Sequence, residues 1–552
     1  MSSTPQAARS RTFPSRQTAL MALRVAAVIA LIALIWSTVQ LEPWRQAAGS
    51  PGNAAASGEI PWTQVNPIGV NTFLGHEVEA WKRERTVEMA AEAGAGWIKQ
   101  HFPWRDIETE QDVYWDNRFQ QDAWAKYDHI VELAERNGLR VIARIDLAPD
   151  WARPFGSSAT APPENYADYA DFIAEFVRHY QGRVQFIQVW NEPNLAAEWG
   201  GAIDPEGYAR LLRAAAEAAW SIDPNVVILS APMAMTTENS ERAMDDLSYW
   251  QALYDAGVAP YFDIMSANAY GLDQPYDAAP DPGALNIRRI ELLRELAIAN
   301  GDGGKPIWLN EYGWNASPPD FPADQLIWSR VDEARQAEWT RAGIEFMRER
   351  HAWFGVANTW YFRQVGDIPK SRSDFYFRMV DVAFTPRPLY WSVKALGDEL
   401  RVAGDGVHND LVAPIRPLGQ WPVVRAPEAS GGEYIAGRPG ARLLIEIDGN
   451  AASLQLAPGQ PATAVKLRLS DNGGTKTIDV EAGEDRLKLF NGSASSAPRR
   501  VTVEVEVTGE EPLLVDGLVV EGRRDYRLAA ASAAALIASA GLYVLLRRGA
   551  AR

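Results

Sequence analysis

Two glutamates, Glu192 and Glu311, lie near the ends of short apolar runs and have side chains suited to proton transfer or nucleophilic attack. Glu192 lies in VQFIQVWNEPN, which begins at residue 184, and Glu311 lies in PIWLNEYGW, which begins at residue 306. Both runs are rich in β-favouring residues, which is typical of parallel strands covered on both faces. Two strand-end carboxyl groups match the needs of glycoside hydrolysis, where one protonates the leaving oxygen and the other acts as nucleophile or base.

Each motif alone is weak evidence for an active site. The Asn-Glu-Pro sequence at residues 191–193 is equally compatible with an ordinary strand-to-loop turn whose charge faces solvent. The pair is stronger, because both glutamates follow the same kind of apolar strand. The carboxyl ends of parallel strands in a barrel converge on one mouth, where barrel enzymes assemble their active sites.

The strands that carry the two glutamates belong to a longer alternating pattern. The expected strands are residues 68–74, 97–104, 140–147, 184–190, 226–231, 262–270, 307–312 and 356–362. The expected helices are residues 82–93, 120–137, 166–180, 205–222, 248–255, 287–300, 332–349 and 389–400. Parallel strands joined by helical crossovers and repeated in this way predict an α/β fold, a (β/α)8 TIM barrel over residues 61–403.

A second pattern, of short alternating strands, predicts a β-sandwich over residues 404–525. Valines at positions 501, 503, 505 and 507 alternate with polar residues, as in a half-buried antiparallel strand. Further strands are expected at residues 443–447, 465–469, 486–490 and 513–520, with a turn at residues 471–474. Two roles fit this domain: glycan binding through an aromatic residue such as Trp421 or Tyr434, or a spacer between the barrel and a membrane.

Two uncharged runs near the termini predict transmembrane helices. Residues 25–41 follow several arginines, which fits a signal peptide or, as we favour, an uncleaved signal anchor. Residues 528–546 precede Arg547 and Arg548 and fit a second span, with a buried Ala-rich helix as the alternative. Because cytoplasmic flanks are enriched in Lys and Arg, both termini are expected in the cytoplasm and both folded domains outside the cell membrane.

The predicted layout therefore has five parts. They are a basic tail with a transmembrane helix (1–45), a flexible Ala-, Gly- and Ser-rich linker (46–60), the barrel (61–403), the β-sandwich (404–525), and a second transmembrane helix with a basic tail (526–552).

Composition excludes several other classes of function. Of the 552 residues, 47% are hydrophobic and 23% are charged, so the chain is not of the disordered type. The formal net charge of -17 argues against a nucleic-acid-binding surface. The chain has no cysteine, which excludes disulfides and thiolate chemistry, and its six histidines form no ligand-spaced cluster, so neither a metal nor another cofactor is expected.

The motifs at residues 190–194 (WNEPN) and 310–314 (NEYGW) fall on the fourth and seventh expected strands. In this the sequence resembles the retaining glycosidases of glycoside hydrolase clan A over roughly residues 61–400. The resemblance is greatest to cellulase-like and family 39 members, through WRDIE at residues 104–108 and APDWA at 148–152. It implies that Glu192 is the general acid/base and Glu311 the nucleophile.

The same resemblance implies substrate-binding roles for three further residues. Asn191 would hydrogen-bond the sugar hydroxyl next to the reacting carbon, Tyr270 would contact the nucleophile, and Trp360 would form the floor of the subsite that holds the cleaved sugar. Trp151 and Trp314 are additional candidates, because indole rings stack on the apolar faces of sugars and both residues follow strand ends. Packing is the alternative for these two tryptophans.

One position departs from the clan's pattern. The clan commonly has an arginine on strand two, whereas this chain has Lys99 in WIKQH at residues 97–101. Lysine lacks the planar two-pronged donor of arginine, although its charge is still expected to support ionised Glu311. His101, on the same face of that strand, is compatible with sugar contact and equally with a packing or supporting role.

Together these features predict a membrane-anchored retaining glycoside hydrolase that acts on an oligo- or polysaccharide outside the cytoplasm. A non-catalytic, membrane-anchored glycan-binding or scaffold protein is the alternative from another class. A trimming component of exopolysaccharide assembly shares the chemistry and differs only in its partners.

Overall fold

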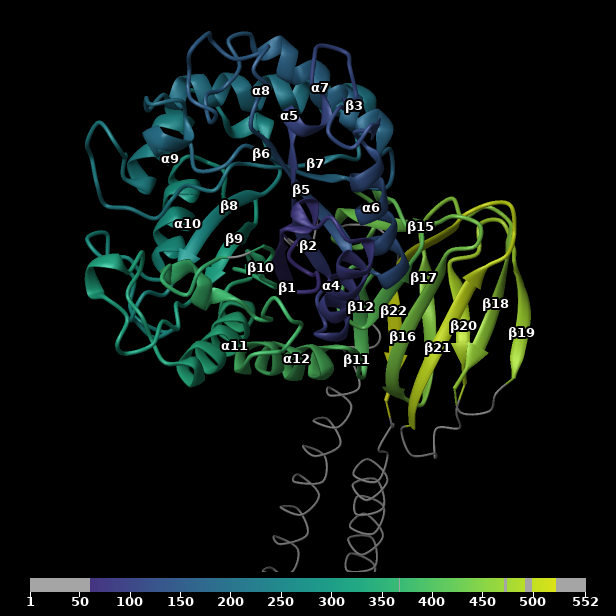
Figure 1. Cartoon of the computed structure of the whole chain (residues 1–552). Coiled ribbons are helices and arrows are strands. Elements are labelled where there is room, and N and C mark those ends of the chain that lie inside the picture. Colours follow the sequence, from purple (N-terminus) through teal and green to yellow (C-terminus); the bar gives the residue numbers. More distant parts are fainter. Residues whose placement is uncertain (1–59, 367, 471–473, 492–498, 523–552) are drawn as a thin grey trace, which may run out of the picture. The chain divides into compact units, whose positions relative to one another are not determined.

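The computed structural model describes residues 60–366, 368–470, 474–491 and 499–522 (Figure 1). All of these residues belong to one compact unit. The predicted transmembrane segments at residues 25–41 and 528–546 lie outside the described residues, as does most of the predicted turn at 471–474. Within the described ranges, no helix combines the length and apolar character needed to cross a membrane.

In the described residues, eight parallel strands form one sheet. They are β1 (Ile68–Thr72), β2 (Trp97–Pro103), β5 (Arg140–Asp146), β6 (Phe186–Val189), β7 (Val227–Leu229), β8 (Met265–Tyr270), β9 (Ile307–Gly313) and β10 (Phe354–Thr359). Neighbours in the sheet follow the order of the chain, and β1 also pairs with β10. A parallel bridge between Leu229 and Ile264 joins β7 to the segment entering β8 and closes the barrel. The predicted (β/α)8 barrel is confirmed.

The barrel helices follow the strands in turn and surround the sheet (Figure 1). They are α4 (Ala80–Glu92), α6 (Ala125–Asn137), α7 (Tyr166–His179), α8 (Pro205–Ile222), α9 (Asp246–Asp255), α10 (Arg289–Ala299), α11 (Glu333–Arg350) and α12 (Pro388–Leu400). The Asn165 side chain caps α7 by accepting from the Ala167 N–H, and Asp204 caps α8 by accepting from the Gly207 N–H. The apolar stripe predicted for residues 166–180 is the buried face of α7.

The loop after β2 differs from the prediction. The helix expected from residue 120 begins at Ala125, and the preceding residues form a short helix, α5 (Trp104–Ile107), and a small hairpin of β3 (Trp115–Asp116) and β4 (Gln121–Asp122). The reason is local, since the Asp122 side chain accepts a hydrogen bond from the Trp124 N–H and so stops the helix from extending backward.

Large side chains fill the amino-terminal end of the barrel. Trp97, Phe186 and Trp308 pack with ring centroids 4.8–5.7 Å apart, and Ile142 belongs to the same buried cluster. Side chains alternate along a strand, so residues two positions further on share the inward face. Those positions carry polar groups, such as Lys99 on β2. The barrel interior is thus closed at its amino end and polar toward its carboxyl end.

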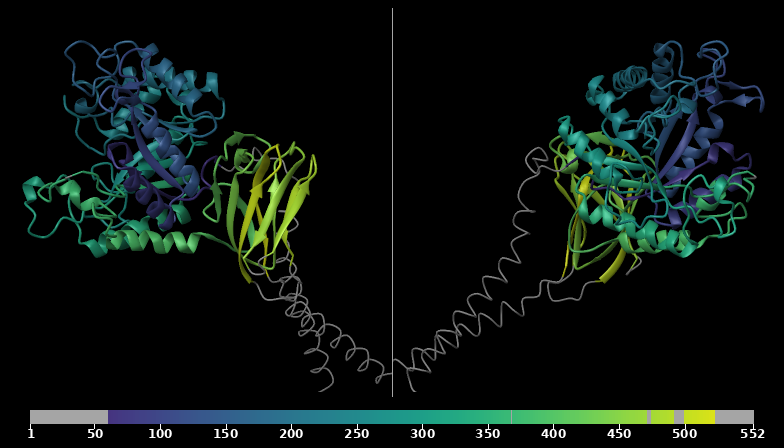
Figure 2. Two further views of the ribbon diagram at one scale, coloured as in Figure 1. Left: turned by 45° about the vertical axis from the view of Figure 1, so that its right-hand side comes forward. Right: turned by 90° about the vertical axis from the view of Figure 1, so that its left-hand side faces the viewer.

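Two antiparallel sheets follow the barrel and pack as a β-sandwich (Figure 2). One contains β11 (Val402–Ala403), β13 (Ile415–Leu418), β16 (Arg442–Gly449), β18 (Thr463–Leu469), β19 (Thr475–Val480) and β21 (Arg499–Val507). The other contains β12 (Gly406–Asn409), β14 (Val423–Arg425), β15 (Glu433–Gly437), β17 (Ala451–Leu456), β20 (Arg486–Phe490) and β22 (Leu513–Glu521). The alternating valines of β21 are buried, as predicted. In the sandwich, β11 and β16 pair in parallel.

Trp421, a predicted glycan-binding candidate of the sandwich, lies in the interior. Its ring is only 4% exposed, and its indole N–H donates to the Arg442 carbonyl at 3.1 Å. Close packing against Gly437 leaves no room there for a side chain. The residue therefore holds the sandwich together and has no free face for a sugar.

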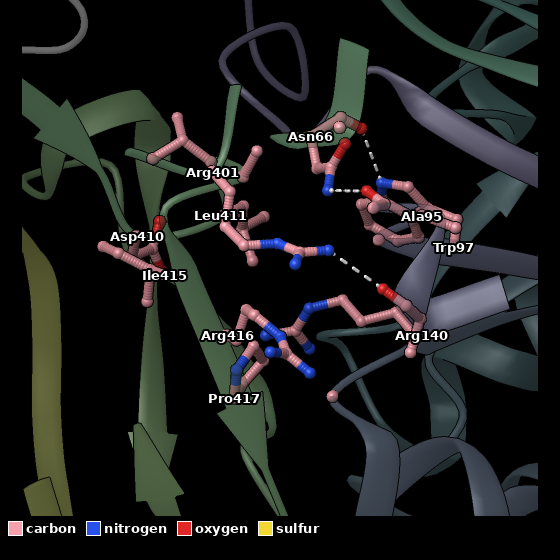
Figure 3. Close-up of a pocket in the computed structure, with 17 residues that line it drawn as sticks. Asn66, Ala95, Trp97, Arg140, Arg401, Asp410, Leu411, Ile415, Arg416 and Pro417 are labelled. Atoms are coloured by element: carbon pink, nitrogen blue, oxygen red, sulfur yellow. Dashed lines mark hydrogen bonds between the residues drawn. The ribbon is translucent and has the colours of Figure 1, made fainter. Parts of the chain in front are cut away.

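The sandwich contacts the amino-terminal end of the barrel. Gln185 exchanges two hydrogen bonds with the backbone of Val423, at 2.7 and 2.8 Å, and Arg425 pairs with Asp263 at 2.7 Å. A small pocket at this junction is lined by Trp97 and Arg140 of the barrel among other residues (Figure 3). Since the pocket lies where the strands begin, it is not at the end of the barrel where active sites form.

Candidate active site

The backbone around Glu192 leaves the regular strand geometry. β6 ends at Val189, and both Trp190 (φ 68°) and Glu192 (φ 44°) adopt left-handed conformations that non-glycine residues seldom occupy. This breaks the in-out alternation, so Trp190 packs against Tyr169 and Trp199 instead of filling the barrel. The strand predicted at 184–190 is shorter in the structure, where β6 covers only Phe186–Val189 and the left-handed Trp190 ends it.

Asn194 fixes the loop that carries Glu192. Its side-chain N–H donates to the carbonyls of Ala234 (2.9 Å) and Met244 (3.0 Å), and its oxygen accepts from the Ala234 N–H at 2.8 Å. The side chain is completely buried. The loop after β6 is thus bound to the loop after β7, a role that sequence reasoning missed although Asn194 belongs to the WNEPN motif.

A β-bulge directs Glu311 into the barrel mouth. Along β9, Leu309 is in register with Ala267 of β8, whereas Glu311 is in register with Asn268, so Asn310 is an extra residue. The pairing of β9 with β10 shifts at the same place. Ile307 and Leu309 pack in the core outside the sheet, and strict alternation would place Glu311 there too. The bulge turns it inward, as bulges beside active sites commonly do.

Glu311 has a hydrogen-bond donor on each oxygen. The Tyr270 hydroxyl donates to Oε2 at 2.6 Å, and Lys99 Nζ lies 3.5 Å from Oε1. Both partners favour the ionised carboxylate. Burial and the charge of Glu311 hold the pKa of Tyr270 well above its usual range, so the phenol keeps its hydrogen. Burial lowers the pKa of Lys99 to about 8, although Glu311 acts against this.

Glu192 has a different environment. Its Oε1 accepts a hydrogen bond of 2.6 Å from the side-chain amide of Asn268. Burial, and after it the negative charges of Glu311 and Glu198, raise the pKa of Glu192 to about 8. Glu192 therefore carries a proton near neutral pH, while Glu311 has a cation and a phenol to stabilise its charge. This is the separation of roles that an acid and a nucleophile require.

An asparagine network supports the two carboxyl groups and was not foreseen from the sequence. Asn71 of β1 donates to the carbonyls of Asn310 (3.0 Å) and Asn358 (3.1 Å), which ties the bulge in β9 to β1 and β10. Asn310 in turn donates to Asn268 Oδ1 at 3.4 Å, leaving the amide N–H of Asn268 for Glu192. The amide flip of Asn268 is assigned from this network.

The predicted substrate-binding residues lie in different settings. Asn191 is buried beside Glu192, and its Oδ1 accepts from Gln188 Nε2 at 3.5 Å. Trp360 is half-buried just after β10, with its ring edge-on to Phe73 at 5.4 Å. The position of Trp360 at the strand end is compatible with the predicted role, which remains a prediction.

The other two predicted tryptophans pack against the protein. Trp314 is 1% exposed, and its indole N–H donates to the Gln274 carbonyl at 2.8 Å, so the prediction that it binds substrate has no support in its placement. Trp151 is half-buried, edge-on to Trp104 at 5.6 Å. Sequence reasoning missed Trp328, which stacks on Tyr270 with ring centroids 5.2 Å apart and lies far along the chain from it.

His101 belongs to a polar cluster on the inner face of β2 and β5. Its Nε2 hydrogen-bonds Asp146 Oδ1, and Arg144 Nε donates to Asp146 Oδ2 at 2.6 Å. Burial lowers the pKa of His101, which keeps the ring neutral. Burial opposes ionisation of Asp146, yet Arg144 and His101 hold its pKa well below its usual range. Arg144 and Asp146 were not singled out in the sequence.

Comparison with known proteins yields no match to any protein-family profile. A curated beta-xylosidase of Geobacillus stearothermophilus is 24% identical over 258 residues, which cover 43% of this chain and 48% of that protein. The chain resembles glycoside hydrolases. A curated beta-glucuronidase of Paenibacillus borealis is 24% identical over 204 residues, covering 36% of this chain and 30% of that protein.

The chain thus spans about half the length of the first of these curated relatives and less of the second. Among solved structures, a family 39 glycoside hydrolase from Bacteroides cellulosilyticus WH2 is similar with a TM-score of 0.46 and 16% identity, covering 82% of each chain. The resemblance to glycoside hydrolases, predicted from the two glutamate motifs, is confirmed by the two curated relatives.

Proposed function

We propose that this protein is a retaining glycoside hydrolase that cleaves a glycosidic bond of an oligo- or polysaccharide. Glu311 is the nucleophile and Glu192 the general acid/base. The observation that carries the proposal is the contrast between their surroundings: Glu311 accepts from Tyr270 and Lys99, whereas burial and Glu311 keep Glu192 protonated near neutral pH.

In the first step, a Glu311 oxygen attacks the anomeric carbon while Glu192 donates its proton to the departing glycosidic oxygen. The carbon–oxygen bond to the leaving group breaks, and a covalent glycosyl-enzyme forms. Because Glu311 then becomes a neutral ester, the charge that raised the pKa of Glu192 disappears. Glu192 has just lost its proton and is now the stronger acid, so it stays ionised and acts as base.

In the second step, Glu192 removes a proton from water as the water oxygen attacks the anomeric carbon. The ester bond to Glu311 breaks, and both carboxyl groups return to their starting protonation states. Two inversions at the same carbon give net retention of configuration. Asn191 and Trp360 are proposed to hold the sugar during both steps, through a hydroxyl hydrogen bond and ring stacking respectively.

The non-catalytic glycan-binding alternative is less well supported, because this chain has both carboxyl groups and a donor network arranged around each. The main argument for this alternative is that the chain has a lysine where the clan has an arginine. However, that lysine, Lys99, contacts Glu311 directly. A decisive experiment is to follow the hydrolysis of an activated aryl glycoside by proton NMR. Early release of the sugar with the anomeric configuration of the substrate supports the proposal, whereas the inverted sugar contradicts it.

We also propose that the protein is anchored in the cell membrane by residues 25–41 and 528–546, with both folded domains outside the cytoplasm. The support is the sequence alone: two uncharged runs, each flanked by arginines on the side expected in the cytoplasm. Trimming of a nascent exopolysaccharide at the membrane would fit such anchoring. Cell fractionation and protease treatment of intact cells test it, and recovery of the native protein from the medium would contradict it.

A further inference from the structure

Three polar side chains that the proposed mechanism does not use line the barrel next to Glu192 and Glu311. His101 on β2 is directly in register with Arg144 on β5, and Asp146 follows two residues later. Trp97 on β2 and Ile142 on β5 face inward in the filled amino end of the barrel. His101, Arg144 and Asp146 lie an even number of residues further along the same strands, so their side chains also face inward. They therefore face the barrel interior near its mouth.

Asp146 orients the other two side chains. It is 2% exposed and uses one oxygen for His101 Nε2 and the other for Arg144 Nε. Arg144 donates to Asp146 through Nε–H, and neither of its two Nη groups forms a hydrogen bond with Asp146. Because Asp146 is ionised, the histidine hydrogen lies on Nε2, and Nδ1 keeps its lone pair.

The outward-facing atoms of this cluster are available to a ligand. In the described part of the chain, neither the Arg144 Nη groups nor His101 Nδ1 has a hydrogen-bond partner. The two side chains are 18% and 19% exposed, so these atoms meet solvent at the mouth. Arg144 lies close enough to the catalytic pair that its charge acts on both Glu192 and Glu311.

The chemistry of the cluster selects against an anionic group. The Arg144 charge is already opposed by Asp146, Glu311 and Glu198, and Lys99 by Glu311. A carboxylate has only acceptor oxygens, so it would face the lone pair of His101 Nδ1 as well as these negative charges. A hydroxyl group both donates and accepts, which matches an imidazole acceptor beside guanidinium donors.

We propose that Arg144 and His101, oriented by Asp146, form a hydroxyl-binding site that holds an uncharged sugar at the reacting position. Arg144 donates to neighbouring sugar oxygens, and His101 Nδ1 accepts from a sugar hydroxyl. This inference rests on the proposed glycosidase function and goes further, because it assigns binding residues and excludes uronic acids as the reacting sugar. Asp146 is a positioning residue in this site.

The first test needs only the wild-type full-length protein. Aryl glycosides of neutral sugars are compared with the aryl glycoside of the matching uronic acid, which differs only by its carboxylate. We expect kcat/KM to favour the neutral sugar by at least roughly 10-fold, as expected when a charge is left without a partner. Faster turnover of the uronic acid would overturn the inference while leaving the proposed function intact.

The second test asks whether Arg144 binds one particular sugar hydroxyl, by removing the hydroxyl, the side chain, or both. In wild-type protein, one member of a monodeoxy glycoside series should lose roughly 10- to 100-fold in kcat/KM. In Arg144→Gln, kcat/KM for the parent glycoside should fall by a similar factor. Removing the same hydroxyl from the substrate of this variant should then lower kcat/KM little further. If the losses caused by the substitution and by the missing hydroxyl simply multiply, Arg144 has a structural role only, and the assignment is overturned.

Controls separate this inference from the proposed function. Arg144→Lys keeps the charge but not the fork of donors, so it should behave like Arg144→Gln, and thermal unfolding reports whether either variant is folded. If both variants cleave all glycosides like wild type, the inference fails and the proposed function stands. If wild-type protein cleaves no glycoside in the panel, both fail together.

Discussion

The hydroxyl of Tyr270 donates a hydrogen bond of 2.6 Å to Oε2 of Glu311. Two residues earlier on the same strand, the amide of Asn268 donates to Glu192, also at 2.6 Å. β8 thus supplies one donor to each proposed catalytic carboxyl group. Because inward-facing residues are two apart on a strand, the pleat of β8 sets the spacing between these two donors.

Replacing Tyr270 with phenylalanine should lower kcat without unfolding the barrel. Ionised Glu311 would lose its shorter hydrogen bond, which we expect to cost roughly 10- to 100-fold in rate. Steady-state kinetics on an aryl glycoside measure the effect. Tyr376→Phe is the matched control, since the Tyr376 hydroxyl donates to the Lys370 carbonyl at the surface, and it should behave like wild type. If Tyr270→Phe were as active as Tyr376→Phe, the Tyr270 hydroxyl would have no role in the reaction.

The activity should depend on pH through Glu192. Since its pKa is raised to about 8, Glu192 is protonated below that pH and able to act as acid. We expect kcat/KM to fall as the pH rises through about 8, because the acid form is lost. In Glu192→Gln, the alkaline limb on activated substrates should become smaller, and the part that is left is assigned to Lys99, whose pKa is also about 8. If the alkaline fall of kcat/KM had the same shape in Glu192→Gln as in wild type, it would be caused by the titration of a group other than Glu192.

Lys99 should support the nucleophile through its charge. In Lys99→Met, ionised Glu311 loses its cationic neighbour, so we expect kcat/KM to fall by about 10-fold. Lys126→Met, which removes a lysine lying over the Tyr127 ring, is the control. A kcat/KM of Lys99→Met equal to that of wild type would show that the charge plays no part.

Asn194 should be needed for stability as well as activity. Asn194→Asp keeps the size of the side chain but places an oxygen against the carbonyls of Ala234 and Met244, where an N–H now donates. We expect a loss of about 2–4 kcal/mol in the free energy of unfolding, measured by chemical denaturation. The exposed Asn117→Asp is the control. No loss in Asn194→Asp would mean that the loop is held by other contacts.

The elements that sequence patterns predicted well are those with local signals. The alternation of strands and helices, the apolar stripe of α7 and the valine ladder of β21 each follow from spacing within one segment. For the same reason, Glu192 and Glu311 were recognised from their own short motifs. The predicted hydrolase resemblance rested on these motifs, on their places in the fourth and seventh expected strands, and on the segments at residues 104–108 and 148–152.

The features that sequence could not supply depend on contacts between distant segments. The bulge at Asn310 exists only as a shift of register against β8 and β10, and the strand by itself would have placed Glu311 on the wrong face. The burial of Trp314 and the stacking of Trp328 on Tyr270 are set by loops that meet only in the folded chain. Arg144 and Asp146 meet His101 only when β2 and β5 are paired.

In the proposed mechanism, Glu311 forms a covalent bond to the sugar. The full-length protein is incubated with a panel of activated 2-fluoro glycosides, which react at the first step and slow the second, and is then analysed by intact-mass and peptide mass spectrometry. We expect one sugar adduct on the peptide that contains Glu311, absent in Glu311→Ala. An adduct on another residue, or rapid glycoside hydrolysis by Glu311→Ala, would contradict it.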